Sequence, residues 1–209
     1  MIKKSGETIK YRAFSVRNFR NIPQISRLTE EEKSIIDTVG NVLPFKVNNY
    51  VIDELIDWEN YKDDPIFHLT FPQKGMLHSD DFDLMAEAIK AGKNRNEIKE
   101  LADQIRHKLN PHPADQMAMN VPELEGQILP GVQHKYRETA LFFPTAGQTC
   151  HSYCSFCFRW PQFVGMDGLK FAMSETDLLV DYLAEHKEVT DVLFTGGDPM
   201  VMGYKVFKG

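Results

Sequence analysis

Two short apolar runs with a helical segment between them constrain the fold of this chain most strongly. Residues 139–143 read Thr-Ala-Leu-Phe-Phe and residues 191–195 read Asp-Val-Leu-Phe-Thr, and both have the length and composition of buried strands. Between them, Ser174 and Asp177 can open a helix whose leucines and tyrosine fall on one side. Strand, helix and strand in this order predict a βαβ unit with parallel strands, and therefore an α/β fold.

One βαβ unit leaves the outer edges of its sheet unpaired and its core half covered. After Met202 the sequence runs only to Gly209. We therefore expect the chain to be the front part of a longer protein, a C-terminally truncated form of it, with residues 131–209 as an incomplete domain.

The first half of the chain carries helix start and stop signals instead. Thr29 precedes three glutamates and then apolar residues, which fits a capping box. Asn94, with Glu97 three residues later, marks a similar start, and the Asn-Pro-His-Pro run at 110–113 ends that helix because proline cannot continue it. Four helices are expected. The first begins after Thr29, the second runs from about Asn49 to Trp58, the third follows a cap at Ser79, and the fourth follows Asn94.

We expect residues 1–130 to form a helical N-terminal region with a connector punctuated by proline and glycine over its last part. His112 lies between two prolines and is expected to be a solvated loop residue. The net charge of −6 disfavours a nucleic-acid partner, which usually requires a basic stripe. The basic start is not followed by an apolar run of signal-peptide length, and no stretch approaches a membrane span. The expected location is therefore the cytoplasm, with no membrane partner.

Three cysteines fall within eight positions, at Cys150, Cys154 and Cys157, and the chain has no others. An odd number packed this tightly does not fit a disulfide framework and favours a metal site in a reducing compartment. Three thiolate ligands on a four-iron cluster leave one iron open to a small molecule, whereas ferredoxin-type sites supply four cysteines. Two alternatives remain open: a structural zinc site completed by His151 or His134, and a catalytic thiol.

The cysteine spacing resembles the signature of radical S-adenosylmethionine (radical SAM) enzymes, in which the open iron of a [4Fe-4S] cluster binds S-adenosylmethionine. Phe156 precedes the third cysteine, where the family places an aromatic residue beside the adenine. The Gly196-Gly197-Asp198-Pro199 run is similar to the segment with which the family meets the methionine amino group. The resemblance implies that Cys150, Cys154 and Cys157 ligate the cluster, that residues 156 and 196–198 frame S-adenosylmethionine, and that the βαβ unit opens a partial TIM-type barrel.

Four stretches narrow the resemblance to the lysine 2,3-aminomutase family: residues 130–136, 141–143, 150–159 and 191–200. This resemblance implies an isomerase that moves an amino group between neighbouring carbons of an amino acid with the help of pyridoxal phosphate. Arg159 and Tyr136 match family residues close to that cofactor, although Tyr136 is as well explained by packing at the strand entrance. The chain departs from the family at Thr139, where an arginine is common, at Phe156, where a histidine is common, and by two extra residues before Cys150.

The departures leave the amino-acid substrate open. The resemblance further implies an electron donor such as a flavodoxin or ferredoxin, and it is compatible with a homo-oligomer. Two other functions stay in view. One is a non-enzymatic iron–sulfur or zinc-binding module, and the other is a radical SAM enzyme with different chemistry.

Overall fold

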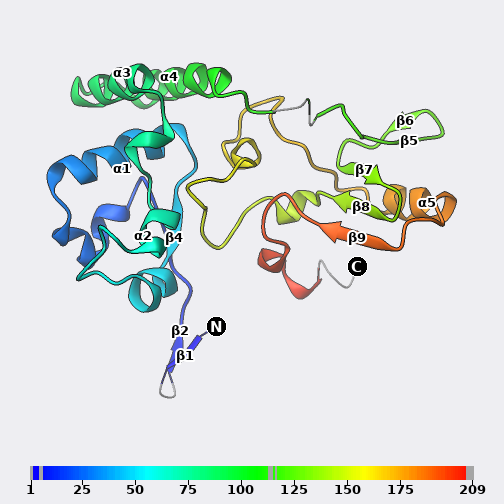
Figure 1. Cartoon of the computed structure of the whole chain (residues 1–209), viewed down its shortest axis with the longest axis horizontal. Helices are drawn as coiled ribbons and strands as arrows, with labels where there is room; N and C mark the ends of the chain where they lie inside the picture. The colour runs from blue at the N-terminus through cyan, green and yellow to red at the C-terminus, as the bar shows by residue number, and fades with distance from the viewer. Residues whose placement is uncertain (1, 5–6, 113–114, 116, 206–209) are drawn as a thin grey trace. The chain divides into compact units, whose positions relative to one another are not determined.

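The computed structural model describes residues 2–4, 7–112, 115 and 117–205. The chain folds as two compact units (Figure 1). Unit 1 comprises Met1–Leu109 and His151–Cys157, and unit 2 comprises Asn110–Cys150 and Phe158–Gly209. The cysteine segment is therefore divided, with Cys150 in unit 2 and the other two cysteines in unit 1.

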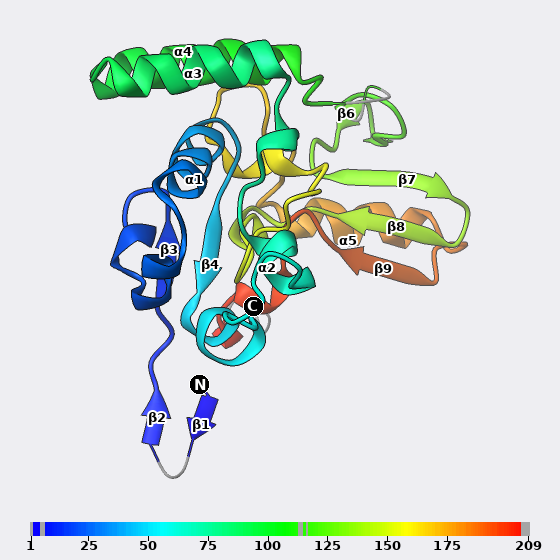
Figure 2. The same ribbon diagram turned by 60° about the vertical axis from the view of Figure 1, so that its left-hand side comes forward.

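Unit 1 is mainly helical. Its α-helices are α1 (Glu30–Val42), α2 (Pro65–Thr70), α3 (Ser79–Lys90) and α4 (Arg95–Lys108). Helices α1, α3 and α4 pack against one another, and Figures 1 and 2 show α3 and α4 side by side. Two antiparallel pairs of three-residue strands complete the unit: β1 (Ile2–Lys4) with β2 (Glu7–Ile9), and β3 (Ala13–Ser15) with β4 (Lys46–Asn48).

The capping predictions for α1 and α4 are confirmed. The Glu32 amide donates to Thr29 Oγ1 at 3.2 Å, and the Thr29 amide donates to Glu32 Oε2 at 2.8 Å. Asn94 and Glu97 form the same reciprocal pair at the start of α4. The predicted Ser79 cap is wrong by one position, because Ser79 is the first helical residue and His78 precedes the helix without a side-chain cap.

The helix expected from about Asn49 to Trp58 is confirmed at its start and is too long at its end. Residues 49–50 are helical, and a π-helical turn continues them at Val51–Leu55. Asn48 Oδ1 accepts from the Tyr50 and Val51 amides, so it caps the start of this segment. The segment ends before Trp58, whose indole donates to the Ile52 carbonyl at 2.7 Å and so occupies an acceptor that a longer helix would use.

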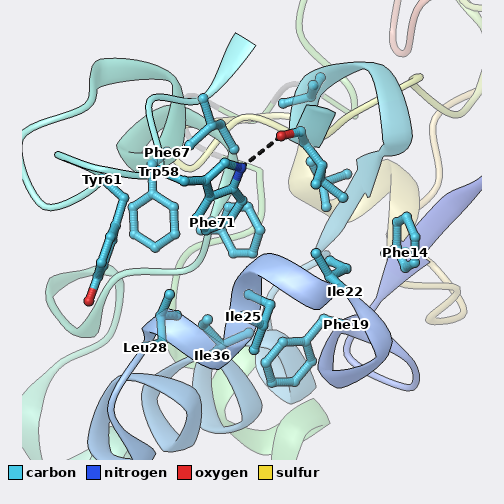
Figure 3. Close-up of a cluster of buried hydrophobic side chains, with 14 of the residues drawn as sticks. Phe14, Phe19, Ile22, Ile25, Leu28, Ile36, Trp58, Tyr61, Phe67 and Phe71 are labelled. Carbon is cyan, nitrogen blue, oxygen red and sulfur yellow. Dashed lines mark hydrogen bonds between the residues drawn. The ribbon is translucent and has the colours of Figure 1, made fainter. Parts of the chain in front are cut away.

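Aromatic side chains form much of the core of unit 1 (Figure 3). Phe67 stacks on Phe71 with ring centroids 4.7 Å apart, and Trp58 meets both rings edge-on. Edge-to-face and offset stacking are the favoured arrangements of aromatic rings. This core packs α2 and the π-helical turn together, so the segment that follows β4 is held rigidly despite its short helices.

Unit 2 contains the βαβ unit that the sequence predicts. Strand β8 (Thr139–Phe142) pairs in parallel with β9 (Asp191–Phe194), with Thr139 opposite Asp191, and α5 (Thr176–Glu185) connects them. Leu179 and Tyr182 of α5 are buried against Val132 and Phe142 of the sheet. The α/β class is therefore confirmed.

The sheet has one strand that the sequence did not predict. Strand β7 (Val132–Tyr136) lies antiparallel to β8. A small hairpin of β5 (Glu123–Leu124) and β6 (Gln127–Ile128) precedes it. Over the described residues this sheet has three strands and does not close into a barrel, so the partial barrel stays a prediction. No helix within the described ranges is long and apolar enough to cross a membrane.

Candidate functional site

The Gly-Gly-Asp-Pro segment lies at the carboxyl end of β9, in unit 2. Gly196 has a φ of +99°, a backbone conformation that residues with a side chain rarely adopt. Gly197 has no room for a side chain, because a Cβ atom there would lie 2.3 Å from the Thr149 carbonyl oxygen and 2.4 Å from that of Gly147. The two glycines are therefore required for different physical reasons.

Asp198 continues the same contact. Its amide donates to the Thr149 carbonyl at 2.8 Å. Its carboxylate accepts from the Met200 amide at 2.9 Å and caps a short 3-10 turn at Pro199–Val201. The carboxylate thus has a role in the fold, as an N-cap.

Residues 147–149 lead directly into Cys150, so unit 2 places the Gly-Gly-Asp segment against the backbone that enters the cysteine loop. Glycine lets a backbone approach a ligand or another segment closely. The close approach that the structure contains is between two segments of the chain itself. Whether Gly196, Gly197 and Asp198 bind a cofactor stays a prediction.

The rest of the cysteine loop, residues 151–157, is held by unit 1. The His151 carbonyl accepts from Tyr11 Oη and from Asn48 Nδ2. The Tyr153 amide donates to the Lys46 carbonyl at 2.8 Å, which attaches the loop to β4. The loop is thus ordered by contacts with residues about a hundred positions earlier in the chain.

Ser155 makes the second attachment. Its amide donates to the Leu69 carbonyl at 2.7 Å, and its hydroxyl donates to the His68 carbonyl at 2.8 Å. Both acceptors belong to α2. Ser155 lies directly after Cys154, so the attachment restrains the position of that cysteine.

The three cysteines form no disulfide within the described part of the chain. Cys154 is exposed, and Cys150 and Cys157 are partly exposed. The Cys157 amide donates to the Cys154 carbonyl at 3.1 Å, so a tight turn joins these two residues. Across the residues that the structure covers, no three His, Cys, Asp or Glu side chains are gathered in a way that would hold a metal ion.

The donor set nevertheless fits a cluster in its chemistry. Thiolates are the ligands of iron–sulfur clusters and also suit zinc. Cys150 and Cys154 are four positions apart in the chain, so their Cα atoms cannot separate by more than about 14 Å. The metal ligands stay a prediction that rests on this chemistry and spacing.

The remaining predicted site residues occupy different environments. Phe156 is 77% exposed, so its ring is not part of the core. Arg159 lies over the Phe143 and Phe158 rings, with its guanidinium carbon 4.6 and 5.0 Å from their centroids. Tyr136, at the end of β7, is 63% exposed and is therefore not the packing residue that was the alternative. Their proposed cofactor contacts stay untested.

His134 has a structural role in unit 2. Its Nδ1 lies 2.6 Å from the Tyr182 hydroxyl and its Nε2 lies 3.2 Å from the Arg137 carbonyl. Burial raises the pKa of Tyr182, with the Glu188 charge adding to the effect. Both ring nitrogens of His134 are thus engaged, which disfavours this histidine as the fourth ligand of a zinc site.

His112 is not the solvated loop residue that its position between prolines predicts. Its side chain is half-buried, and its Nε2 is buried without a hydrogen-bond partner among the described residues. Burial lowers the pKa of His112, and this outweighs a hydrogen bond with the Leu169 backbone.

Several residues that position the site were missed in the sequence. They are Tyr11, Lys46, Asn48, His68 and Leu69, which hold the cysteine loop, and Gln148, which contacts the glycine segment. Their contacts are long-range and mostly involve backbone atoms, so helical or strand periodicity carries no signal for them.

Comparison with curated proteins gives a consistent similarity. The chain is 29% identical over 178 residues to a putative L-lysine 2,3-aminomutase of Aquifex aeolicus, which covers 85% of this chain and 37% of the relative. It is 22% identical over 194 residues to the L-lysine 2,3-aminomutase of Bacillus subtilis, with 93% and 33% covered. It is 34% identical over 79 residues to that of Haemophilus influenzae, with 38% and 22% covered.

No family model matches the chain, and no solved structure matches it. The chain spans about a third of the length of the curated relatives that it matches over most of its own length. The similarity therefore concerns the part of those relatives that this chain covers, and within it the chain is similar to proteins named L-lysine 2,3-aminomutase.

Proposed function

We propose that this chain carries the cluster-binding part of a radical SAM enzyme of the lysine 2,3-aminomutase type. In this proposal Cys150, Cys154 and Cys157 ligate a [4Fe-4S] cluster with one open iron. S-adenosylmethionine binds there, framed by Phe156 and residues 196–198. When bound, the cluster supplies the electron that cleaves S-adenosylmethionine and starts a 1,2-amino migration on an amino acid.

The observation that carries the proposal is the packing of Gly197 on residues 147–149. It brings the second predicted binding segment to the backbone that enters the first cysteine, although the two are separated by nearly 50 positions in the sequence. Ligands of parallel α/β sheets bind at the carboxyl ends of the strands, which is where this contact lies. The similarity to proteins named L-lysine 2,3-aminomutase extends over 85% of the chain.

The chain's own residues would hold and orient the cofactors. Attachment of residues 151–155 to β4 and α2 limits the movement of the loop that carries Cys154. Gly197 packs directly on the Gly147–Thr149 backbone. In this proposal the 196–198 segment would receive the cationic amino group of S-adenosylmethionine. Pyridoxal phosphate would be held in part by Arg159 and Tyr136, and this part of the proposal rests on the family resemblance.

The first test is anaerobic reconstitution of the chain with iron and sulfide. We expect about four irons and four sulfides per chain, because three thiolates with an open iron suit a [4Fe-4S] cluster. Each single Cys→Ala variant should lose the cluster. Bound zinc without sulfide would refute the proposal and support the structural metal module instead.

A matched control is His151→Asn. The His151 side chain is exposed and meets the Tyr11 ring edge-on, while the hydrogen bonds that anchor the loop go to its carbonyl, so the variant should retain the iron and sulfide of the parent. In a zinc site completed by this histidine, the same variant would lose the metal. The two functions therefore give opposite results.

The second test concerns the reaction. The reconstituted chain is incubated with S-adenosylmethionine and a chemical reductant, and 5′-deoxyadenosine and methionine are measured. We expect both products to form, because the proposed cluster and cofactor-binding segments lie within this chain. An intact cluster without cleavage of S-adenosylmethionine would contradict the radical SAM assignment.

A further inference from the structure

Gln148 ties together the carboxyl ends of β8 and β9. Its side-chain Nε2 donates to the Pro144 carbonyl at 2.9 Å and to the Thr195 carbonyl at 3.2 Å. Pro144 lies two positions after the end of β8, and Thr195 directly follows β9. One amide group thus bridges the two strand ends from which the cysteine loop and the glycine segment leave.

The orientation of this amide is fixed by chemistry. Both partners are carbonyl oxygens, which only accept, so the NH₂ group must face them and Oε1 must point elsewhere. Oε1 is buried and has no hydrogen-bond partner in the described part of the chain. A buried acceptor without a protein partner is costly, so the position of this side chain is set by the two hydrogen bonds that its NH₂ group donates.

The same amide packs directly on Gly196. A Cβ atom at Gly196 would lie 2.3 Å from Gln148 Oε1 and 2.6 Å from Nε2. Gly196 has a φ of +99°, and because glycine has no side chain its backbone can also adopt many other conformations. Contact with the Gln148 amide limits that freedom. The backbone of Gln148 is held too, in an inverse γ-turn closed by the Thr149 amide and the Gly147 carbonyl at 2.9 Å.

We propose that Gln148 is a positioning residue that fixes the backbone of Gly196–Gly197 in its ligand-binding conformation. The amide bridges the strand ends, covers Gly196, and so keeps the segment from sampling the conformations open to two adjacent glycines. The ligand is S-adenosylmethionine, and in this respect the inference rests on the proposed function. Neither the cysteine spacing nor the Gly-Gly-Asp-Pro motif includes this residue.

The test on the protein itself needs no cofactor. Gln148→Met keeps the length and volume of the side chain but cannot donate to the two carbonyls. Amide hydrogen exchange at Asp198, whose N–H donates to Thr149, should accelerate by roughly five- to a hundredfold, the range of two ordinary hydrogen bonds. Exchange at Ala140, in the middle of β8, should stay within twofold of the parent.

Gln24→Met is the matched control. Gln24 also carries a buried Oε1 without a partner among the described residues and also donates through Nε2, to Asp53, but it lies in unit 1. It should leave exchange at Asp198 unchanged. Unchanged exchange at Asp198 in Gln148→Met would overturn the inference, as would equal acceleration in the Gln24 variant.

The second measurement is the dissociation constant of S-adenosylmethionine on the reconstituted chain. Gln148→Met should weaken binding by about tenfold or more while iron and sulfide content stay at the parent level, because no cysteine is touched. If the parent binds S-adenosylmethionine and Gln148→Met binds it equally tightly, the role of Gln148 is overturned and the proposed function is unaffected. A parent chain that retains its cluster but does not bind S-adenosylmethionine overturns both.

Discussion

Replacement of Gly197 by alanine tests the packing that supports the proposed site. The new Cβ would lie 2.3 Å from the Thr149 oxygen, 2.4 Å from the Gly147 oxygen and 2.6 Å from the Thr149 nitrogen. All three are backbone atoms, so no side-chain rotation relieves the overlap. To restore ordinary contact, the two segments must move apart by about 1 Å.

A movement of that size also breaks the hydrogen bond of 2.8 Å that the Asp198 amide donates to the Thr149 carbonyl. Overpacking costs about 1–3 kcal/mol and a lost hydrogen bond about 0.5–1.5 kcal/mol. We therefore expect unit 2 to lose about 1.5–4.5 kcal/mol of unfolding free energy. S-adenosylmethionine binding should be lost in the reconstituted variant as well, because Gly197 belongs to the proposed binding segment.

The assay is urea denaturation followed by tryptophan fluorescence. The chain has two tryptophans, Trp58 in unit 1 and Trp160 in unit 2, so a Trp58→Phe background reports unit 2 alone. Gly203→Ala is the control, because a Cβ there meets nothing within 4 Å. It should stay within about 0.5 kcal/mol of the parent. A Gly197→Ala midpoint equal to that of the control would refute the reasoning.

Three further predictions concern stability. Arg106→Met should cost unit 1 about 2–4 kcal/mol in urea denaturation followed by Trp58 fluorescence in a Trp160→Phe background, because the buried guanidinium donates to the Val42 and Asn41 carbonyls at the end of α1; a neutral effect would contradict this. Asn94→Ala should cost about 1 kcal/mol by the same assay through loss of the α4 cap, and Asn94→Asp, which can still accept, should recover most of it. Burial lowers the pKa of His112 in the folded chain, so between the ordinary histidine pKa and this lowered pKa the unfolded chain binds more protons than the folded chain. The free energy of unfolding should therefore fall as the pH drops through this interval, and His112→Phe should reduce that pH dependence.

Local signals predicted local structure well. The caps at Thr29 and Asn94 could be predicted from the sequence because the capping residue and its glutamate lie three positions apart and need no tertiary partner. The parallel pairing of β8 and β9 followed from two apolar runs with a helix between them. Strand β7 was missed because only Val132 of its five residues is fully buried, so the segment shows no clear alternation.

A tertiary contact accompanies the early end of the helix expected over residues 49–58. The apolar residues stay at helical spacing beyond Leu55, yet the Trp58 indole donates to the Ile52 carbonyl, an acceptor that a longer helix would use. This contact is not visible in a periodic pattern. The attachment of Ser155 to α2 escapes sequence reasoning for a related reason, because it joins positions 87 apart through backbone carbonyls.

The motif assigns one role to the glycine pair, whereas the structure assigns a different role to each glycine. A motif treats Gly196 and Gly197 alike, as residues that admit a ligand. In the fold, Gly196 is needed for its positive φ and Gly197 for the space that the Gly147–Thr149 backbone occupies. Both requirements come from the chain's own backbone, so the motif is first a condition for folding unit 2 at this point. A glycine variant that unfolds unit 2 also loses binding, so its loss of binding indicates a cofactor contact only where it exceeds the loss expected from unfolding. The Gln148 substitution leaves both glycines in place and is therefore the sharper test of the site.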